Sequence, residues 1–125
     1  MGYRSEGVLA VSKEIVPHFM AALSRNEEAS RMVFKHNDDL IKDYQGDGNM
    51  LIRWSAIKWY EGYEDIDAIQ AFINDPSDFG PENVGEDGTD VRDCFKFVRI
   101  GEEPDDVVME GNGFWDIYVE RSITY

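Results

Sequence analysis

Residues 40–59 read LIKDYQGDGNMLIRWSAIKW, and this stretch predicts a β-hairpin. Two arms, Leu40–Tyr44 and Met50–Trp59, flank the segment Gln45–Asn49, which has the length and glycine content of a hairpin connection. In the second arm large apolar residues alternate with other residues, as on a strand buried on one face. The alternating residues are Met50, Ile52 and Trp54. The alternation slips near the end of the arm, which predicts a β-bulge at Ser55–Ala56.

The segment before this hairpin predicts one strand and two helical pieces. Val8–Val11 is a short apolar run, and Ser12 is a suitable N-cap for the helix that follows. Asn26 is a suitable N-cap for the second piece. Apolar residues recur in both pieces at the spacing of an amphipathic helix. The first face comprises Val16, Phe19, Met20 and Leu23, and the second comprises Ala29, Met32 and Val33.

The segment after the hairpin predicts a helix, two strands and two acidic loops. The helix ends at Asn74–Pro76, because a proline disfavours helical backbone in the residue before it. Cys94–Ile100 and Phe114–Thr124 are rich in β-branched and aromatic residues and predict strands. Residues 75–93 and 101–113 are rich in acids, glycine and proline and predict loops. The apolar face of the helix comprises Ile66, Ile69, Phe72 and Ile73.

This order of elements is typical of an α+β fold. An antiparallel sheet of about five strands, with two or three helices packed on one face, accommodates it. The chain of 125 residues has the length of a single domain, residues 1–125. A single cysteine, Cys94, and a beginning without a basic segment and an apolar run favour a cytoplasmic protein. No apolar run approaches the ~20 residues that span a bilayer.

The charge is distributed very unevenly along the chain. Residues 1–60 hold eight acids and eight bases, so their net charge is 8 − 8 = 0. Residues 61–125 hold the other 18 acids and four bases, so their net charge is 4 − 18 = −14. This sign argues against direct contact with nucleic acid, whose phosphates need bases. It favours a partner that is itself basic.

Motifs for catalysis, metals and cofactors are lacking. Two histidines, one cysteine and no Gly-x-Ser-x-Gly sequence offer little for nucleophilic catalysis. Asp43 begins a run that resembles a calcium loop, but Trp54 stands where that loop needs a bidentate glutamate. The turn Gly85–Asp90 could hold a cation loosely, although a hydrated acidic turn is favoured. We therefore expect no enzyme, no catalytic residue, no metal and no cofactor, and we expect His18 at the surface or its boundary.

Four aromatic residues close in sequence have two readings. Trp54, Trp59, Tyr60 and Tyr63 either pack in and around the core or form an anchor patch for a partner, since Trp and Tyr dominate interface hot spots. Trp59 and Tyr60 cannot both face inward on one strand. The sequence leaves this choice open.

Short motifs give a resemblance that spans most of the chain. They are MGYRS at 1–5, IKWY at 57–60, FVRIGE at 97–102 followed by Asp105–Asp106, and IYVERSI at 117–123. On these motifs the chain resembles a group of small acidic proteins of tailed phages and prophages. The resemblance implies a phage product acting in the cytoplasm of a bacterial host. Small acidic phage proteins of this class and size are similar to anti-defence inhibitors, such as anti-CRISPR proteins.

These observations lead to one functional hypothesis and two alternatives. The hypothesis is an inhibitor that binds a basic, nucleic-acid-binding protein of the host and presents carboxylates in place of phosphates. It requires the two acidic loops to converge on one patch. The alternatives are a small-molecule or nucleotide-binding sponge, and an acidic structural or regulatory phage protein without mimicry. The expected partner-binding residues are Asp75, Asp78, Glu82, Glu86, Asp87, Asp90, Asp93, Glu102, Glu103, Asp105, Asp106 and Glu110.

Overall fold

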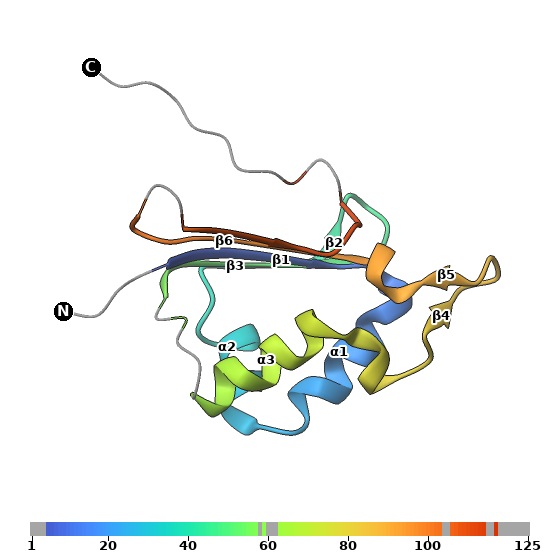
Figure 1. The fold of residues 1–125 in the computed structure, drawn as a ribbon, viewed down its shortest axis with the longest axis horizontal. Helices are drawn as coiled ribbons and strands as arrows, with labels where there is room; N and C mark the ends of the chain where they lie inside the picture. The colour runs from blue at the N-terminus through green and yellow to red at the C-terminus, as the bar shows by residue number, and fades with distance from the viewer. Residues whose placement is uncertain (1–4, 58, 60–62, 104–105, 115–116, 118–125) are drawn as a thin grey trace, which may run out of the picture.

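A five-stranded antiparallel sheet organises the fold and confirms the α+β prediction (Figure 1). The computed structural model describes residues 5–57, 59, 63–103, 106–114 and 117. The strand order is β2-β3-β1-β6-β7, and a two-stranded ribbon, β4–β5, stands apart from the sheet. The strands are β1 Ser5–Val11, β2 Asp39–Tyr44, β3 Asn49–Ile57, β4 Asn83–Val84, β5 Thr89–Asp90, β6 Phe95–Ile100 and β7 Val107–Glu110. The helices are α1 Val16–Leu23, α2 Glu27–Phe34 and α3 Glu64–Asn74, with 3₁₀ turns η1 Lys13–Ile15, η2 Pro76–Phe79 and η3 Val91–Asp93.

The hairpin predicted from residues 40–59 is confirmed as β2 and β3. The bulge is also in its predicted place. Ser5 of β1 lies opposite Ile57 and Gly7 lies opposite Trp54, so two steps on β1 match three on β3. The extra residue falls in Ser55–Ala56 and restores the inward direction of the last apolar side chains.

The three helices cover one face of the sheet, and the core lies between these two layers (Figure 1). The four predicted apolar residues of α3 are all buried. In α2 the predicted cap is confirmed, because the Asn26 side chain accepts a hydrogen bond from the Ala29 amide at 2.9 Å. Trp54 joins sheet and helix, since its indole N–H donates to the Met32 carbonyl at 2.9 Å. In the part of the chain that is described, no helix has the length and apolar character needed to cross a membrane.

The buried face of α1 is rotated by about one residue from the predicted one. Phe19 and Leu23 are buried as expected, but Val16 and Met20 are only partly buried. The N-terminal turn instead buries Ile15 and His18. The prediction that His18 lies at the surface or its boundary is therefore wrong.

The environment of His18 explains its burial. Its side chain is 4% exposed, and Nε2 lies 2.8 Å from the Pro81 carbonyl oxygen. Nδ1 has no hydrogen-bond partner among the described residues. Gly80 leaves the space for this ring, because a Cβ added there would lie 2.5 Å from Nε2.

Two segments predicted as loops contain regular structure. Residues 75–93 form η2, the β4–β5 ribbon and η3. Residues 101–113 contain β7, which pairs with β6 through Val107–Glu110. The predicted strand Phe114–Thr124 lies mostly outside the described residues. Of its described members, Phe114 and Ile117 belong to no strand, and the Ile117 amide donates back to the Phe114 carbonyl at 2.9 Å, as in a turn.

Two of the four clustered aromatic residues pack in and around the core, as the first interpretation predicted. Trp54 is fully buried, and Trp59 packs against it with ring centroids 5.7 Å apart. The Trp59 indole also donates to the Gln70 side chain at 3.0 Å. Tyr63 is 50% exposed, and Tyr60 lies outside the described residues.

Candidate functional site: an acidic cleft at one end of the sheet

Residues 75–93, the first predicted acidic loop, and residues 101–106, the first part of the second, lie at opposite ends of the sheet (Figure 1). Residues 75–93, the acidic segment, lead into the start of β6. Residues 101–106 follow the end of β6 and turn back into β7. Six residues of extended strand separate the two loops by roughly 20 Å. The twelve carboxylates therefore do not converge on one patch, which the inhibitor hypothesis required in the form based on both loops.

The carboxylates after β6 lie in a region of mixed charge. Glu102 and Glu103 are exposed, and Asp105 lies outside the described residues. Asp106 forms an ion pair with Arg99 at 3.4 Å. At the same end of the sheet Arg53 pairs with Asp39 at 3.1 Å. These bases weaken the negative field there.

The seven carboxylates of the acidic segment are all exposed. They are Asp75, Asp78, Glu82, Glu86, Asp87, Asp90 and Asp93. Within the described part of the chain none of them forms an ion pair with a base. The one base of the segment, Arg92, is directed elsewhere, to Glu110 at 3.8 Å and to the Asn74 carbonyl at 2.8 Å. Glu110 thus lies at this end too, but its charge is partly compensated.

Local hydrogen bonds fix the shape of the acidic segment. The β4–β5 turn is closed by Gly85 and Gly88, both at positive φ, with a hydrogen bond of 3.3 Å between them. Asp90 accepts a hydrogen bond from the Arg92 amide at 2.9 Å and so caps η3. Asp93 accepts one from the Asn112 side chain at 3.2 Å. The backbone that carries the charges is therefore ordered by its own polar groups.

A cleft of about 440 Å³ lies between the ribbon, η1 and the start of β6. We call it the acidic cleft. Among the described residues that line it, four are carboxylates and none is a base. Its lining residues are Ser12, Glu14, Val84, Gly85, Glu86, Asp87, Thr89, Asp93 and Cys94.

Glu14 is the functional candidate that the sequence did not reveal. It belongs to the half of the chain with zero net charge, and η1 carries it to the cleft. The Ser12 hydroxyl donates to its carboxylate at 2.7 Å, and this hydrogen bond lowers the pKa of Glu14. The residue therefore stays ionised at neutral pH and adds to the negative field of the cleft.

The chemistry of the cleft is electrostatic. Burial raises the pKa of the Cys94 thiol, so a reactive thiolate is disfavoured there. The thiol lies 3.5 Å from the Asp90 carbonyl oxygen. Among the described residues, no three His, Cys, Asp or Glu side chains are arranged to hold a metal ion. A spread of carboxylates of this kind suits an extended cationic group, such as a guanidinium or ammonium side chain.

Comparison with protein-family models, with curated proteins and with solved structures gave no match to this chain. Function therefore has to follow from the geometry and charge of the chain itself.

Proposed function

We propose that this protein binds a basic, nucleic-acid-binding protein and inhibits it by covering the basic surface. The contact is the acidic cleft together with the exposed carboxylates of the acidic segment. One observation carries the proposal: four carboxylates line a concave site in which no described residue is a base. An arginine or lysine of the partner would enter the cleft, and the surrounding charges would steer the encounter.

The size of the site limits how much nucleic acid it could imitate. Duplex DNA carries one charge per ~1.7 Å of helix axis, so the eight carboxylates of this contact, seven in the acidic segment and Glu14, correspond to about 14 Å of duplex. The twelve carboxylates expected from the sequence would have matched about 20 Å. The proposed mimicry is therefore local, and covers a small group of phosphate contacts.

The biological setting is part of the same proposal. A phage product in a bacterial cytoplasm, acting against a host defence protein, would agree with the phage-like motifs at 1–5, 57–60 and 97–102. The competing proposal is an acidic structural or regulatory protein whose charge serves only solubility. The two differ in one respect: only the inhibitor needs its charges at a particular place.

A pair of charge-matched variants tests that difference. Glu86→Gln/Asp87→Asn removes two charges from the cleft, and Glu102→Gln/Glu103→Gln removes two from the opposite end of the sheet. Both pairs are exposed, so neither should disturb the core. The tagged protein and both variants are incubated with a bacterial lysate at low salt, and the captured proteins are eluted with increasing salt or with duplex DNA.

We expect the unmodified protein and the 102/103 variant to retain a basic protein that duplex DNA displaces. The cleft variant should lose most of it, and elution should require less salt. Equal retention by both variants would contradict the proposal, because the position of the charges would then not matter. Capture that persists unchanged at high salt would contradict it as well.

A further inference from the structure

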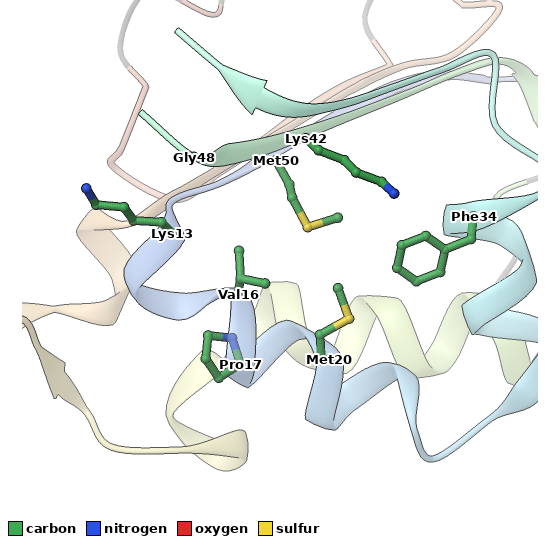
Figure 2. Close-up of a pocket in the computed structure, with 8 residues that line it drawn as sticks. All are labelled: Lys13, Val16, Pro17, Met20, Phe34, Lys42, Gly48 and Met50. Atoms are coloured by element: carbon green, nitrogen blue, oxygen red, sulfur yellow. The ribbon is translucent and has the colours of Figure 1, made fainter. Parts of the chain in front are cut away.

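A second cavity, of about 500 Å³, lies between α1, the end of α2 and the β2–β3 hairpin (Figure 2). We call it the cationic groove. Its walls are apolar, and among the described residues that line it only two, both lysines, are charged. The lining residues are Lys13, Val16, Pro17, Met20, Phe34, Lys42, Gly48 and Met50.

The groove follows from the rotation of α1 and from one polar residue in the hairpin. Because Ile15 of η1 and Phe19 of α1 are the residues that turn into the core, Val16 and Met20 remain available as a wall. Lys42 follows Leu40 on the face of β2 that is directed toward the helices, and Figure 2 shows its side chain extending into the space beside Phe34. A charged side chain at that position cannot complete the core, so the space stays open.

The charge of the groove is opposite to that of the whole chain. The net charge is −14, yet both ionisable groups in the groove are ammonium groups. Among the described residues, no carboxylate lies within ion-pair distance of Lys13 or Lys42. By contrast, Arg31, Arg53 and Arg99 each pair with a carboxylate at 3.4 Å or less. The groove thus combines an apolar surface with two lysines that form no ion pair with another described residue.

This combination selects the chemical class of a ligand. Apart from the two ammonium groups, the lining offers no side chain that forms a strong hydrogen bond. Sugars and nucleobases need such partners for their polar edges and would leave them unsatisfied here. An aliphatic tail needs none, and the flexible thioethers of Met20 and Met50 can adapt to it. The volume falls in the range of sites for small organic ligands.

We infer that the cationic groove binds an anionic amphiphile of the fatty-acid type. The aliphatic tail lies against Met20, Met50 and Phe34, and the carboxylate pairs with the ammonium group of Lys42. The Lys13 side chain lies at the opposite side of the groove and extends away from Lys42 (Figure 2). This site is separate from the acidic cleft, and it does not depend on the protein partner proposed above. It gives the small-ligand alternative a definite place and a definite chemistry.

The test uses decanoate, below its micelle concentration, and decanol as a neutral ligand with the same tail. Methyl-labelled methionines report the place of binding by NMR, and calorimetry reports the affinity. We expect decanoate to shift the signals of Met20 and Met50 and to leave Met109, an exposed residue of β7 on the other face of the sheet, unchanged. Decanol should bind more weakly, because it lacks the charge.

Lysine variants test the role of the charge. Lys42→Gln should weaken decanoate binding about threefold, the effect of one exposed ion pair, and Lys13→Gln should weaken it less, because its ammonium group lies farther from the carboxylate. Lys96→Gln is the matched control, since Lys96 lies between the inward-facing Phe95 and Phe97 and is directed to the opposite face. The control should bind as the unmodified protein does.

Three results would overturn the inference. The first is equal binding of decanoate and decanol, which would indicate partition of the tail without recognition of the carboxylate. The second is decanoate binding that leaves Met20 and Met50 unshifted. The third is displacement of decanoate by an apolar acidic peptide that binds more tightly, which would make a protein segment the occupant.

Val16→Phe, which fills the groove and keeps an apolar residue on α1, should abolish binding without changing the circular dichroism spectrum.

Discussion

Gly111 is the position where the structure predicts the sharpest loss of stability from a single added methyl group. Its φ is +86°, and a Cβ there would lie 2.3 Å from the Phe95 carbonyl oxygen. An alanine in left-handed backbone costs about 1–2 kcal/mol. The clash also forces this oxygen away from the Gly113 amide, whose hydrogen bond of 3.0 Å contributes about 0.5–1.5 kcal/mol. Gly111→Ala should therefore lower the free energy of unfolding by about 1.5–3.5 kcal/mol.

Gly46→Ala is the matched control for this prediction. Gly46 has a similar φ of +73°, but a Cβ there would meet nothing within 4 Å. The control should lose only the backbone cost of about 1–2 kcal/mol. Urea unfolding followed by tryptophan fluorescence measures the free energy of unfolding of both variants. In thermal unfolding, each kcal/mol lost should lower Tm by roughly 4 °C. An equal loss in the two variants would show that Gly111 makes no close approach to β6, and the reasoning would fail.

Four further predictions concern the core, a helix terminus and, in two cases, the cleft. Trp54→Phe removes the hydrogen bond to the buried Met32 carbonyl and should cost about 1–3 kcal/mol in urea unfolding; an unchanged midpoint would contradict it. Asn26→Ala removes the N-cap of α2 and should cost about 1 kcal/mol, with helical circular dichroism retained. The Cys94 thiol, buried and with a raised pKa, should react with a disulfide reagent far more slowly in the folded protein than in urea. The lowered pKa of Glu14 stabilises the folded state above the ordinary carboxyl pKa, and this contribution is lost as pH falls through the lowered value. The stability difference between the unmodified protein and Glu14→Gln should thus be larger at pH 6 than at pH 3.

Local patterns in the sequence correctly predicted those elements whose formation depends mainly on residues close together in the chain. The hairpin, its bulge and the buried face of α3 follow from alternation, glycine placement and helical spacing, which act over a few residues. β7 was missed because it has only four residues and lies among acids and glycines. Its stability comes from pairing with β6, a tertiary contact that no local pattern reports. His18 was misplaced for a similar reason, since Gly80 and Pro81 create its pocket from a distant part of the chain.

The failed convergence of the acidic loops has a different origin. The sequence predicted a strand over residues 94–100, with one acidic loop before it and the other after it. Loops on either side of one strand leave it at opposite ends, so the predicted elements already argued against a single patch. The charge composition predicted a negative surface. The direction of β6 determined that the carboxylates are divided between the two ends of the sheet. The contribution of Glu14 could not be predicted, because it depends on how η1 meets the β4–β5 ribbon.

The turn η1 connects the two proposed sites and keeps them distinct. Its three residues point three ways: Lys13 lines the cationic groove, Glu14 lines the acidic cleft, and Ile15 is buried in the core. Because the core side chain fixes the turn, the two charged neighbours are held toward different ligands of opposite sign. Neutralising Lys13 should therefore weaken the binding of an anionic amphiphile and leave a basic partner bound, whereas neutralising Glu14 should do the reverse. Equal loss of amphiphile binding and partner binding from either substitution would contradict the existence of two separate sites. The charged residues of η1 would then contribute only to the stability of the fold.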